Sequence, residues 1–498
     1  MKKRVAAALA LFLFVFSFIG QQAFAEERTI EQEIIYHILV DRFNNGDYAR
    51  DEAIDIEDPF AYHGGDIQGI IKKLDKLQEI GVTAISLSPI MANSEKGYHG
   101  YWIEDFFSVE EQFGTMEDVQ QLVEEAHKRD MKVLLEFVIN YVSVSHPWVD
   151  DAEKQDYFTV QDKTEPEWMN QTAKLNLENP EVEAYLIEAA NFWIDETGID
   201  GFLLQAADEA PLSFLKNFTE KIKATNPNFY VLGDLLFSDE NREEMIATVP
   251  LDAVDQLAVQ KALTEVFTEP GKPVEEIFSI VQSNSGDKGL LFVDDMYTKR
   301  FTHSFAENGR NALTVWQLAL TTMFTSPGVP MLFQGSEIPM LGETPEDIQK
   351  LVEFNSGEPD LKEFYTRISA LRSTFPVLQY GDFELVGTSG AMSVFKRTYN
   401  GETMYIAINN DETSRQLDIT DIEPGMQLVG YLGDHIFREI EDGVYRIGLP
   451  RESAEVFSIQ PDQGMNWGLI LFAGGIFIIF VVSVIVLSLK QKKQEQQG

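Results

Sequence analysis

The stretch GIDGFLLQAADE, residues 198–209, joins a short apolar run to a polar end. Its core, residues 201–204, is short, apolar and bounded by turn residues, which is typical of a fully buried strand. The segment before it carries apolar residues at the spacing of one helix face: Val182, Tyr185, Leu186, Ala189, Phe192 and Trp193. A helix followed by a buried strand predicts one unit of an α/β fold.

The same alternation of helix and strand continues through most of the chain. Eight segments are predicted to be strands: 34–40, 84–88, 133–138, 201–204, 230–232, 253–255, 290–293 and 331–333. The helical patterns between them favour a parallel sheet with crossover helices. Eight such strands predict a closed (β/α)8 TIM barrel, in which functional sites lie at the carboxyl ends of the strands.

The spacing of these elements predicts the domain organisation. The barrel is expected over 26–376, and the stretch 142–175 is too long for an ordinary connection, which predicts a short inserted subdomain after the third strand. After the barrel the helical pattern stops. Short alternating segments such as 392–397 and 404–409 then predict a C-terminal antiparallel β-sandwich over 377–460.

Both ends of the chain carry signals for membrane targeting. Residues 1–25 have a basic start, an apolar run and the small-residue site Ala23-Phe24-Ala25, which predicts a secretory signal peptide. A first membrane anchor is the alternative. Residues 467–489 contain no charge, and a transmembrane helix needs about 20 apolar residues. They predict one C-terminal transmembrane helix, with a buried core helix as the alternative.

Charge and cysteine content narrow the classes of function. Lysines directly after the apolar segment place the tail, 490–498, in the cytoplasm, so the ectodomain is expected outside the cell membrane. The formal net charge of −42 excludes nucleic acid as a partner, because like charges repel. The chain has no cysteine, so neither disulfides nor thiolate metal sites are available.

Ten motifs in order resemble glycoside hydrolase family 13, the α-amylase family, across nearly the whole ectodomain. They are IIYHILVDRFNNGD (34–47), HGGDIQGI (63–70), GVTAISLSPI (81–90), YHGYWIEDF (98–106), VLLEFVIN (133–140), LNLENPEV (175–182), GIDGF (198–202), YVLGD (230–234), FVDD…RF (292–301) and GVPMLFQGSE (328–337). The resemblance implies the barrel fold and hydrolysis of α-glucans.

The catalytic positions implied by the resemblance hold other residues. Gln205 stands at the nucleophile position, Asp234 at the general acid position and Tyr297 at the position of the third carboxylate. Hydrolysis with retention needs two carboxyl groups about 5–5.5 Å apart, and an amide cannot form the glycosyl ester. Four neighbouring positions also depart from the family pattern: Leu203 for Arg, Met296 for His, Glu136 for Asp and Tyr141 for His.

These replacements indicate a repacked site. Gln205 with Leu203 removes both partners of a charge pair, and Met296, Tyr297 and Tyr141 are expected to fill the innermost sugar pocket with apolar bulk. A rescued hydrolase remains an alternative, with the substitute carboxylate coming from one of four nearby acids: Asp208, Glu209, Asp294 and Asp295. Salt bridging and loop capping are the other interpretation of these acids.

Other positions keep the family pattern for sugar or metal binding. His99, Tyr101 and Asn140 correspond to residues that contact the innermost sugar. The resemblance also implies a calcium site, for which hard oxygen ligands are suited, from the following residues: Asn45, Asp47, Asp51, Asp66 and the carbonyl of Gly64. Arg50 replaces a frequent Asn there, and an ordinary polar loop is the alternative. A second family calcium is expected to be replaced by the ammonium of Lys174, paired with Glu209 or Asn140.

These features together predict a membrane-anchored, extracytoplasmic α-amylase-family protein with lost or strongly reduced hydrolysis. It is expected to bind α-glucan or maltooligosaccharide, or to act as a scaffold for a membrane-protein partner. In this it resembles the heavy chains of heteromeric amino-acid transporters, which combine an amylase-like ectodomain with one membrane span. The alternatives are an active hydrolase that digests starch or maltodextrin at the cell surface, and a structural partner without sugar binding.

Overall fold

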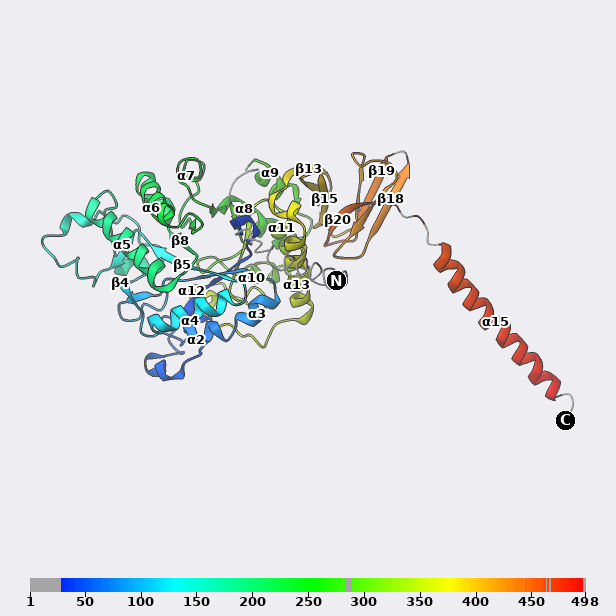
Figure 1. Cartoon of the computed structure of the whole chain (residues 1–498), viewed down its shortest axis with the longest axis horizontal. Helices are drawn as coiled ribbons and strands as arrows, with labels where there is room; N and C mark the ends of the chain where they lie inside the picture. The colour runs from blue at the N-terminus through cyan, green and yellow to red at the C-terminus, as the bar shows by residue number, and fades with distance from the viewer. Residues whose placement is uncertain (1–27, 284–288, 442, 463, 465–466, 496–498) are drawn as a thin grey trace, which may run out of the picture.

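The computed structural model describes residues 28–283, 289–441, 443–462, 464 and 467–495. The signal peptide predicted over 1–25 lies outside these residues. Figure 1 shows three regions in chain order, which are a large α/β region, a smaller β domain and a separate terminal helix.

Eight parallel strands form the closed barrel, and every predicted strand is present. They are β1 (Ile35–Ile38), β2 (Ala84–Leu87), β5 (Lys132–Val138), β8 (Gly201–Gln205), β9 (Tyr230–Gly233), β10 (Ala253–Asp255), β11 (Gly289–Leu291) and β12 (Val329–Phe333). The barrel closes because β1 pairs in parallel with both β2 and β12. The sequence-based prediction of a TIM barrel is therefore confirmed.

Alternation along the strands separates two packed cores, because successive side chains point to opposite faces of a strand. The barrel interior holds a small cluster that includes Leu134, Leu203, Leu232 and Phe292. The opposite faces pack against the helices in a much larger cluster. Leu203 therefore faces the barrel axis and Phe202 faces the helices, although both lie in the same buried strand.

Helices surround the barrel and connect its strands. They are α2 (Ile67–Ile71), α3 (Leu74–Glu79), α4 (Met116–His127), α5 (Pro180–Thr197), α6 (Leu212–Thr225), α7 (Arg242–Thr248), α8 (Leu257–Thr268), α9 (Glu275–Ser283), α10 (Phe301–Ala306), α11 (Ala312–Thr325), α12 (Pro345–Ile348), α13 (Pro359–Thr374) and α14 (Pro376–Tyr380). Helix α5 shows why they form: Asn179 caps it, Pro180 starts it, and Gly198 ends it at φ 70°, where a side chain would be strained.

The connections at the carboxyl ends of the strands carry two small antiparallel pairs. Strands β3 (Met91–Asn93) and β4 (Ile103–Val109) pair after β2. Strands β6 (Tyr141–Ser143) and β7 (Thr172–Lys174) pair after β5 and enclose the segment predicted as an insertion over 142–175. Between β6 and β7 the described backbone contains only short 3-10 turns, so this segment is mostly irregular.

The C-terminal domain is an antiparallel β domain, as predicted. Its strands are β13 (Asp382–Ser389), β14 (Met392–Tyr399), β15 (Glu402–Asn409), β16 (Arg415–Ile419), β17 (Met426–Gly430), β18 (Ile436–Glu441), β19 (Val444–Leu449) and β20 (Ser453–Pro461). They form one sheet in the order β13-β14-β15-β20-β17-β18-β19-β16. The predicted sandwich is thus a single sheet curled around its own core, which includes Val394, Tyr405 and Ile447.

Buried arginines join the barrel to this domain. Arg372 donates hydrogen bonds to the carbonyl oxygens of Phe324 and Gly328 at 3.0 and 2.6 Å. Arg397, in the C-terminal domain, donates to the carbonyl oxygens of Thr325 at the end of α11 and of Gly381, at 2.5 and 3.0 Å. Both guanidinium groups are almost fully buried, and they satisfy carbonyl groups that would otherwise lose their hydrogen bonds with water. The junction is therefore a fixed, hydrogen-bonded contact.

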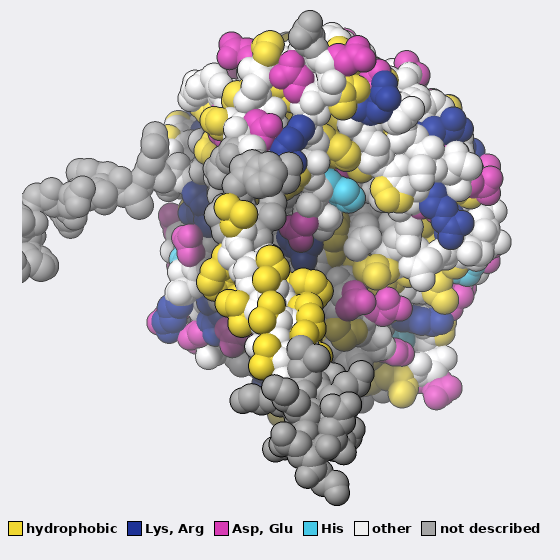
Figure 2. All heavy atoms as spheres, turned by 90° about the vertical axis from the view of Figure 1, so that its right-hand side faces the viewer, with side chains coloured by type: hydrophobic (Ala, Val, Ile, Leu, Met, Phe, Trp, Pro, Cys, Tyr) yellow, Lys and Arg dark blue, Asp and Glu magenta, His cyan; other side chains and the backbone are white. Residues whose placement is uncertain are grey.

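The last helix, α15 (Trp467–Glu495), extends away from the C-terminal domain (Figure 1). Large apolar side chains are exposed along it, including Leu471 and Phe477, and Figure 2 shows them as a yellow column. Within the described part of the chain, however, no helix is both long and apolar enough to cross a membrane. The transmembrane span predicted over 467–489 is therefore not found. The side chains at 467–470, 473 and 488–495 lie outside the described part of the chain.

Candidate active site

Gln205 ends strand β8 at the centre of the barrel. The side chain is fully buried, and among the described residues neither its amide oxygen nor its amide nitrogen has a hydrogen-bond partner. Asn140 lies beside it and donates from Nδ2 to the carbonyl oxygen of Ala206 at 2.8 Å. Leaving a buried polar group without a partner costs about 1–3 kcal/mol. Gln205 is thus a polar group in a place where packing alone would favour an apolar one.

Four acidic side chains from β5 and from the ends of β9, β10 and β11 line a pocket inside the barrel. Glu136 lies in β5, Asp234 follows β9, Asp255 ends β10 and Asp295 follows β11, and all four line one pocket. Burial raises the pKa of Asp234 and Asp255, and it raises the pKa of Glu136 and Asp295 as well. The cause is desolvation, because a charged carboxylate is less stable away from water. The cluster therefore favours protonated, neutral carboxyl groups.

Asp234 and Asp255 interact within this cluster. Each accepts a backbone N–H: Asp234 from Ala206 at 3.2 Å and Asp255 from Leu235 at 3.0 Å. Burial raises the pKa of both groups, and the negative charge of Asp234 raises the pKa of Asp255 further. The pair therefore favours at least one neutral carboxyl group.

Two further groups fix Glu136. The Tyr101 hydroxyl donates to Glu136 Oε1 at 2.8 Å, and His37 Nε2 lies 3.7 Å from Glu136 Oε2. Burial lowers the pKa of His37 to about 4, so this imidazole is neutral at pH 7. His37 and Asp255 were missed in the sequence, although Asp255 is the last residue of the predicted strand 253–255 and its position at a strand end was an available signal.

Two of the predicted sugar-binding residues, His99 and Tyr101, lie together, whereas Asn140 bonds to the backbone of Ala206. The rings of His99 and Tyr101 are stacked with centroids 5.3 Å apart, and Trp168 also stacks on Tyr101 at 4.5 Å. Tyr297 lies against Tyr101 with a centroid distance of 6.4 Å. Burial lowers the pKa of His99 to about 3, which makes it a neutral hydrogen-bonding group at pH 7.

The pocket between these groups has a volume of only about 30 Å³. Ligand pockets usually measure about 300–1,000 Å³, whereas a volume of this size suits one or two water molecules. Met296 and Tyr297 line it, and the Tyr101 hydroxyl lies 3.0 Å from the Met296 sulfur. The expected bulk is therefore present at Met296 and Tyr297, whereas Tyr141 does not line the pocket. However, the lining is more acidic than the predicted apolar packing.

The acids that could replace a missing nucleophile have other partners. Asp208 accepts the backbone N–H groups of the Leu236–Ser238 segment (236–238), and Asp295 accepts those of Tyr297 and Thr298, both at 2.8 Å. Asp294 accepts the N–H of Phe301 at 2.9 Å. These contacts agree with loop capping. Asp295 alone among the four candidates lines the central pocket.

The predicted pairing of Lys174 is confirmed. Its ammonium nitrogen lies 2.6 Å from Glu209 Oε2, and Lys163 pairs with the other oxygen of the same carboxylate. Glu209 is thereby held by two ammonium groups at the edge of the barrel mouth. Its charge is neutralised there, so it is not free to enter the central pocket.

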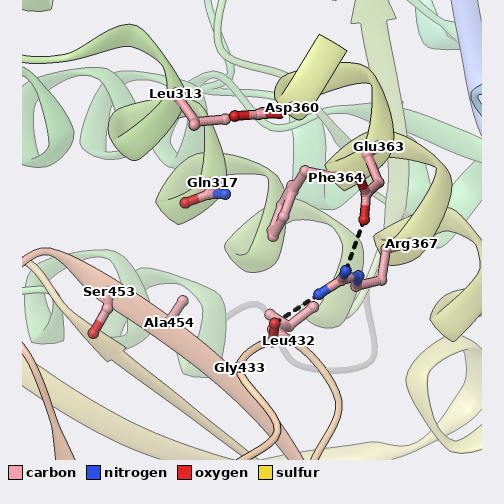
Figure 3. Close-up of a pocket in the computed structure, with 10 residues that line it drawn as sticks. All are labelled: Leu313, Gln317, Asp360, Glu363, Phe364, Arg367, Leu432, Gly433, Ser453 and Ala454. Atoms are coloured by element: carbon pink, nitrogen blue, oxygen red, sulfur yellow. Dashed lines mark hydrogen bonds and ion pairs between the residues drawn. The ribbon is translucent and has the colours of Figure 1, made fainter.

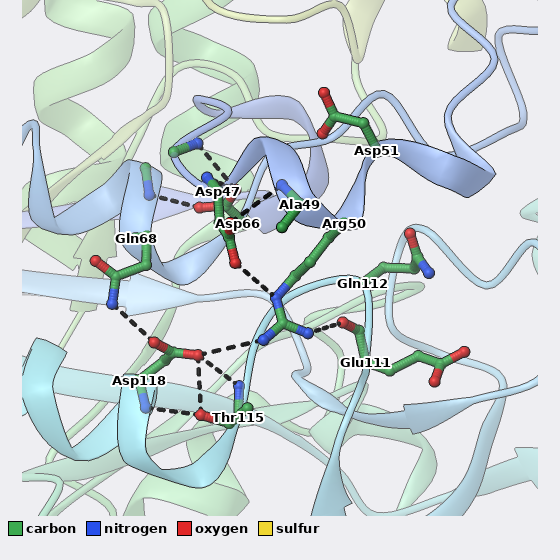
Figure 4. A network of polar contacts seen from close by, with 12 residues as sticks. Asp47, Ala49, Arg50, Asp51, Asp66, Gln68, Glu111, Gln112, Thr115 and Asp118 are labelled. Carbon is green, nitrogen blue, oxygen red and sulfur yellow. Dashed lines mark hydrogen bonds and ion pairs between the residues drawn. The ribbon is translucent and has the colours of Figure 1, made fainter.

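The residues predicted to bind calcium lie in a network around a guanidinium (Figure 4). Asp66 accepts N–H groups from Gly69 at 2.6 Å and Asp47 at 2.7 Å, and Arg50 Nε lies 3.2 Å from Asp47 Oδ2. Figure 4 shows Asp51 pointing away from Asp47 and Asp66. Asn45 Oδ1 has no partner in the described chain. The carboxylates do not converge on one point, so this arrangement does not fit a calcium ion.

Comparisons with known proteins agree with this architecture. The family model for the α-amylase catalytic domain matches residues 37–370, and that for the α-amylase C-terminal domain matches 381–457. The crystal structure of an Anoxybacillus α-amylase is 39% identical with a TM-score of 0.83, and covers 88% of this chain and 100% of its own.

Two further relatives are similar over most of the chain. An α-amylase from Geobacillus thermoleovorans, solved with acarbose, is 36% identical with a TM-score of 0.81 and the same coverage of both chains. A cyclomaltodextrinase from Thermoanaerobacter pseudethanolicus is 27% identical and covers 82% of this chain and 76% of its own. With its eight-stranded barrel and C-terminal β domain, the chain belongs to the α-amylase family, glycoside hydrolase family 13.

Proposed function

We propose that the chain is a glucan-binding or scaffolding member of its family with lost or strongly reduced hydrolysis. The observation that supports this most directly is the central pocket of about 30 Å³, which is too small for a sugar ring. The amide of Gln205, at the predicted nucleophile position, is fully buried and does not line this pocket. Without a carboxylate at position 205, the glycosyl ester of a retaining mechanism has no atom to form on.

The loss of chemistry is expected to be large. Removing a catalytic nucleophile costs on the order of 10⁴–10⁶ in turnover in well-studied hydrolases. Asp234 keeps a carboxyl group, but its side chain is one methylene shorter than Glu. A misplacement of about 1 Å can cost roughly 10²-fold. The change at Gln205 by itself is sufficient for the proposed loss of hydrolysis.

A second candidate is an active hydrolase that acts on starch or maltodextrin at the cell surface. The comparisons favour it, because the two amylases at 39% and 36% identity are matched over their full length. This candidate requires Met296 and Tyr297 to move and open the pocket, and it requires Asp234, Asp255 or Asp295 to act in a new role. A third candidate, a structural partner of a membrane protein, needs neither event.

Membrane attachment is part of the proposal. The apolar side chains exposed on α15, such as Phe480 at 64% exposure, support a helix that is covered by lipid or by another protein. Together with the basic residues after 489 and the signal sequence predicted over 1–25, they favour an extracytoplasmic ectodomain with a cytoplasmic tail. Extraction at alkaline pH, which releases peripheral proteins, tests this: the full chain should stay with the membrane fraction.

One experiment separates the three candidates. The full chain is assayed for reducing-sugar release from soluble starch, and its binding of maltooligosaccharides is measured by isothermal titration calorimetry. Binding without turnover is the expected result. Turnover above about 1 s⁻¹, which is typical of working enzymes, would establish the second candidate. Neither turnover nor binding would favour the structural partner.

A further inference from the structure

One histidine and two glutamates meet on the outside of the barrel, beside α10. His303 lies in this helix, and Glu307 follows its last residue, so the two side chains are one helical turn apart and share a face. Glu343 reaches the same place from the connection between β12 and α12. Each residue offers one ligand atom, and the three atoms lie within 4.8 Å of one another. In the part of the chain that the structure describes, this is the one cluster of this kind.

The separations between these atoms suit a metal ion. His303 Nε2 lies 3.7 Å from Glu307 Oε1 and 3.8 Å from Glu343 Oε2. Zinc binds nitrogen and oxygen ligands at about 2.0–2.2 Å, so two ligand atoms at a tetrahedral angle are about 3.4 Å apart. The observed separations exceed this value by only a few tenths of an ångström. Small rotations of the side chains would therefore bring all three atoms to bonding distance.

The two segments that carry the ligands are already fastened together. The backbone N–H of Arg300, directly before α10, donates to the carbonyl oxygen of Gly342 at 2.9 Å. The Arg300 guanidinium is buried, and its Nε donates to the carbonyl oxygen of Ile348 at 3.1 Å. The chain on both sides of Glu343 is thus tied to the start of α10. A site whose ligands are held in place before binding loses little conformational entropy when the ion enters.

Lys299 orients the carboxylates and leaves their ligand atoms facing the histidine. Its ammonium nitrogen lies 2.6 Å from Glu307 Oε2 and 3.3 Å from Glu343 Oε1, which are the two oxygens that do not face His303. Carboxylates that bind metals are commonly held in this way through a second hydrogen bond. The hydrogen bond from Lys299 also holds the pKa of Glu307 below its ordinary value, so this carboxylate is ionised at pH 7. One ammonium does not neutralise two carboxylates, and the remaining negative charge favours a cation.

The imidazole selects the class of metal. Calcium and magnesium prefer ligand sets made of oxygen, whereas imidazole suits zinc and its neighbours among the transition metals. His303 Nδ1 is buried without a hydrogen-bond partner among the described residues, so Nε2 is the ring nitrogen that the carboxylates and an ion can reach. One nitrogen and two oxygens leave a fourth tetrahedral position for water or another ligand.

We propose that His303, Glu307 and Glu343 form a binding site for a divalent transition-metal ion, with zinc as the best fit. The site shares no residue with the central pocket of the barrel, so the inference is independent of the proposed function. The ion would join α10 to the connection after β12. Because the segment that carries Met296 and Tyr297 runs directly into α10, such a joint would stabilise the segment that fills the central pocket.

Calorimetric titration of the untagged, full-length chain with zinc chloride tests the proposal, after metals have been removed with a chelator. One zinc ion should bind per chain, at least about tenfold more tightly than calcium. The double variant His303→Ala/Glu343→Gln should bind zinc at least about a hundredfold more weakly, because even the loss of an outer-shell partner costs about 10–100-fold in metal affinity. The matched control is His127→Gln, which removes another exposed histidine that faces a single carboxylate, that of Asp200. It should bind zinc as the unmodified chain does.

Each other outcome would overturn the site. Equal zinc affinity in the double variant would place the ion elsewhere in the chain. A dissociation constant above about 1 mM in the unmodified chain would reduce the cluster to surface ion pairs only. Calcium bound as tightly as zinc would contradict the choice of metal class by His303. Circular dichroism shows whether the variants are folded, which is expected because neither replaced side chain is buried. Starch turnover in the unmodified chain would overturn the proposed function and leave the metal site unaffected.

Discussion

The central pocket of the barrel and the cavity between α11, α13 and the C-terminal sheet differ in the surroundings of their polar side chains. In the barrel, Glu136, Asp234 and Asp255 are buried and favour their neutral forms, and only about 30 Å³ remains between them. In the second cavity, Asp360 and Gln317 face about 380 Å³ of open space (Figure 3). The resemblance to the family points to the first region. The larger open space lies in the second region.

The largest effect is expected at Gln205. Gln205→Asp should not restore starch hydrolysis, because Leu203 supplies no positive partner and Tyr297 still fills the pocket. Adding a carboxylate to a buried acidic cluster should also destabilise the fold, by about 3–5 kcal/mol if the new charge stays unpaired. Reducing-sugar release and urea unfolding measure the two effects.

The matched comparison for that variant is Gln205→Leu, which removes the unsatisfied amide without adding charge. It should be at least as stable as the unmodified chain, because no buried polar group loses a partner. Recovered hydrolysis in Gln205→Asp alone would contradict the closed-pocket interpretation and make the barrel centre the working site.

The second-largest effect is expected in how the stability of the fold depends on pH. Burial raises the pKa of Asp234 to about 7, above the ordinary value of 3.8, and also raises the pKa of Asp255. A raised pKa means that the folded state holds its proton more tightly, so the stability from this pair is complete below pH 4 and is lost as the pH rises through about 7. Thermal unfolding between pH 5 and 8.5 should show this decline.

Asp234→Asn/Asp255→Asn should flatten this pH dependence, because neither amide titrates. The control is Glu188→Gln, which replaces an exposed acid on α5 by its amide. It should leave the slope of stability against pH unchanged. A slope that persists in the double asparagine variant would assign the pH dependence to other groups.

A smaller effect on stability is expected at Glu209, whose negative charge is neutralised by Lys163 and Lys174. Lys163→Met/Lys174→Met leaves this carboxylate, whose side chain is only 12% exposed, without its partners. Stability should fall by about 1–3 kcal/mol, less than for a fully buried charge because Glu209 can turn toward water. Lys216→Met, which breaks an exposed pair with Glu220, should have no measurable effect on urea unfolding.

The smallest effect is expected from calcium. Since Arg50 pairs with Asp47 where the ion was predicted, adding 1 mM calcium should not raise the melting temperature. A site with a dissociation constant one hundredfold below the free concentration would add about 2.7 kcal/mol, which is easily detected. A clear stabilisation would establish the predicted calcium site, and Arg50→Asn tests whether removing the guanidinium creates one.

Much of the fold could be predicted because its signals are local. All eight barrel strands follow from short apolar runs, and the α5 helix follows from Asn179, Pro180 and Gly198 at its ends. The curled sheet of the C-terminal domain could not be told from a two-sheet sandwich, because alternation fixes which face of a strand is buried but not which strands pair. The membrane span was predicted from composition and is not found among the described residues.

The sequence by itself determined the barrel, the family and the residue types at its centre, since a side chain's chemistry and its position after a strand are local properties. Only the tertiary structure decided that Asp255 and His37 join the acid cluster, that the central pocket is nearly closed, and that a larger cavity opens between α11, α13 and the C-terminal sheet. The volume of a pocket, the burial of its side chains and the interactions between its carboxyl groups depend on residues far apart in the chain. These properties emerge only when those residues pack together.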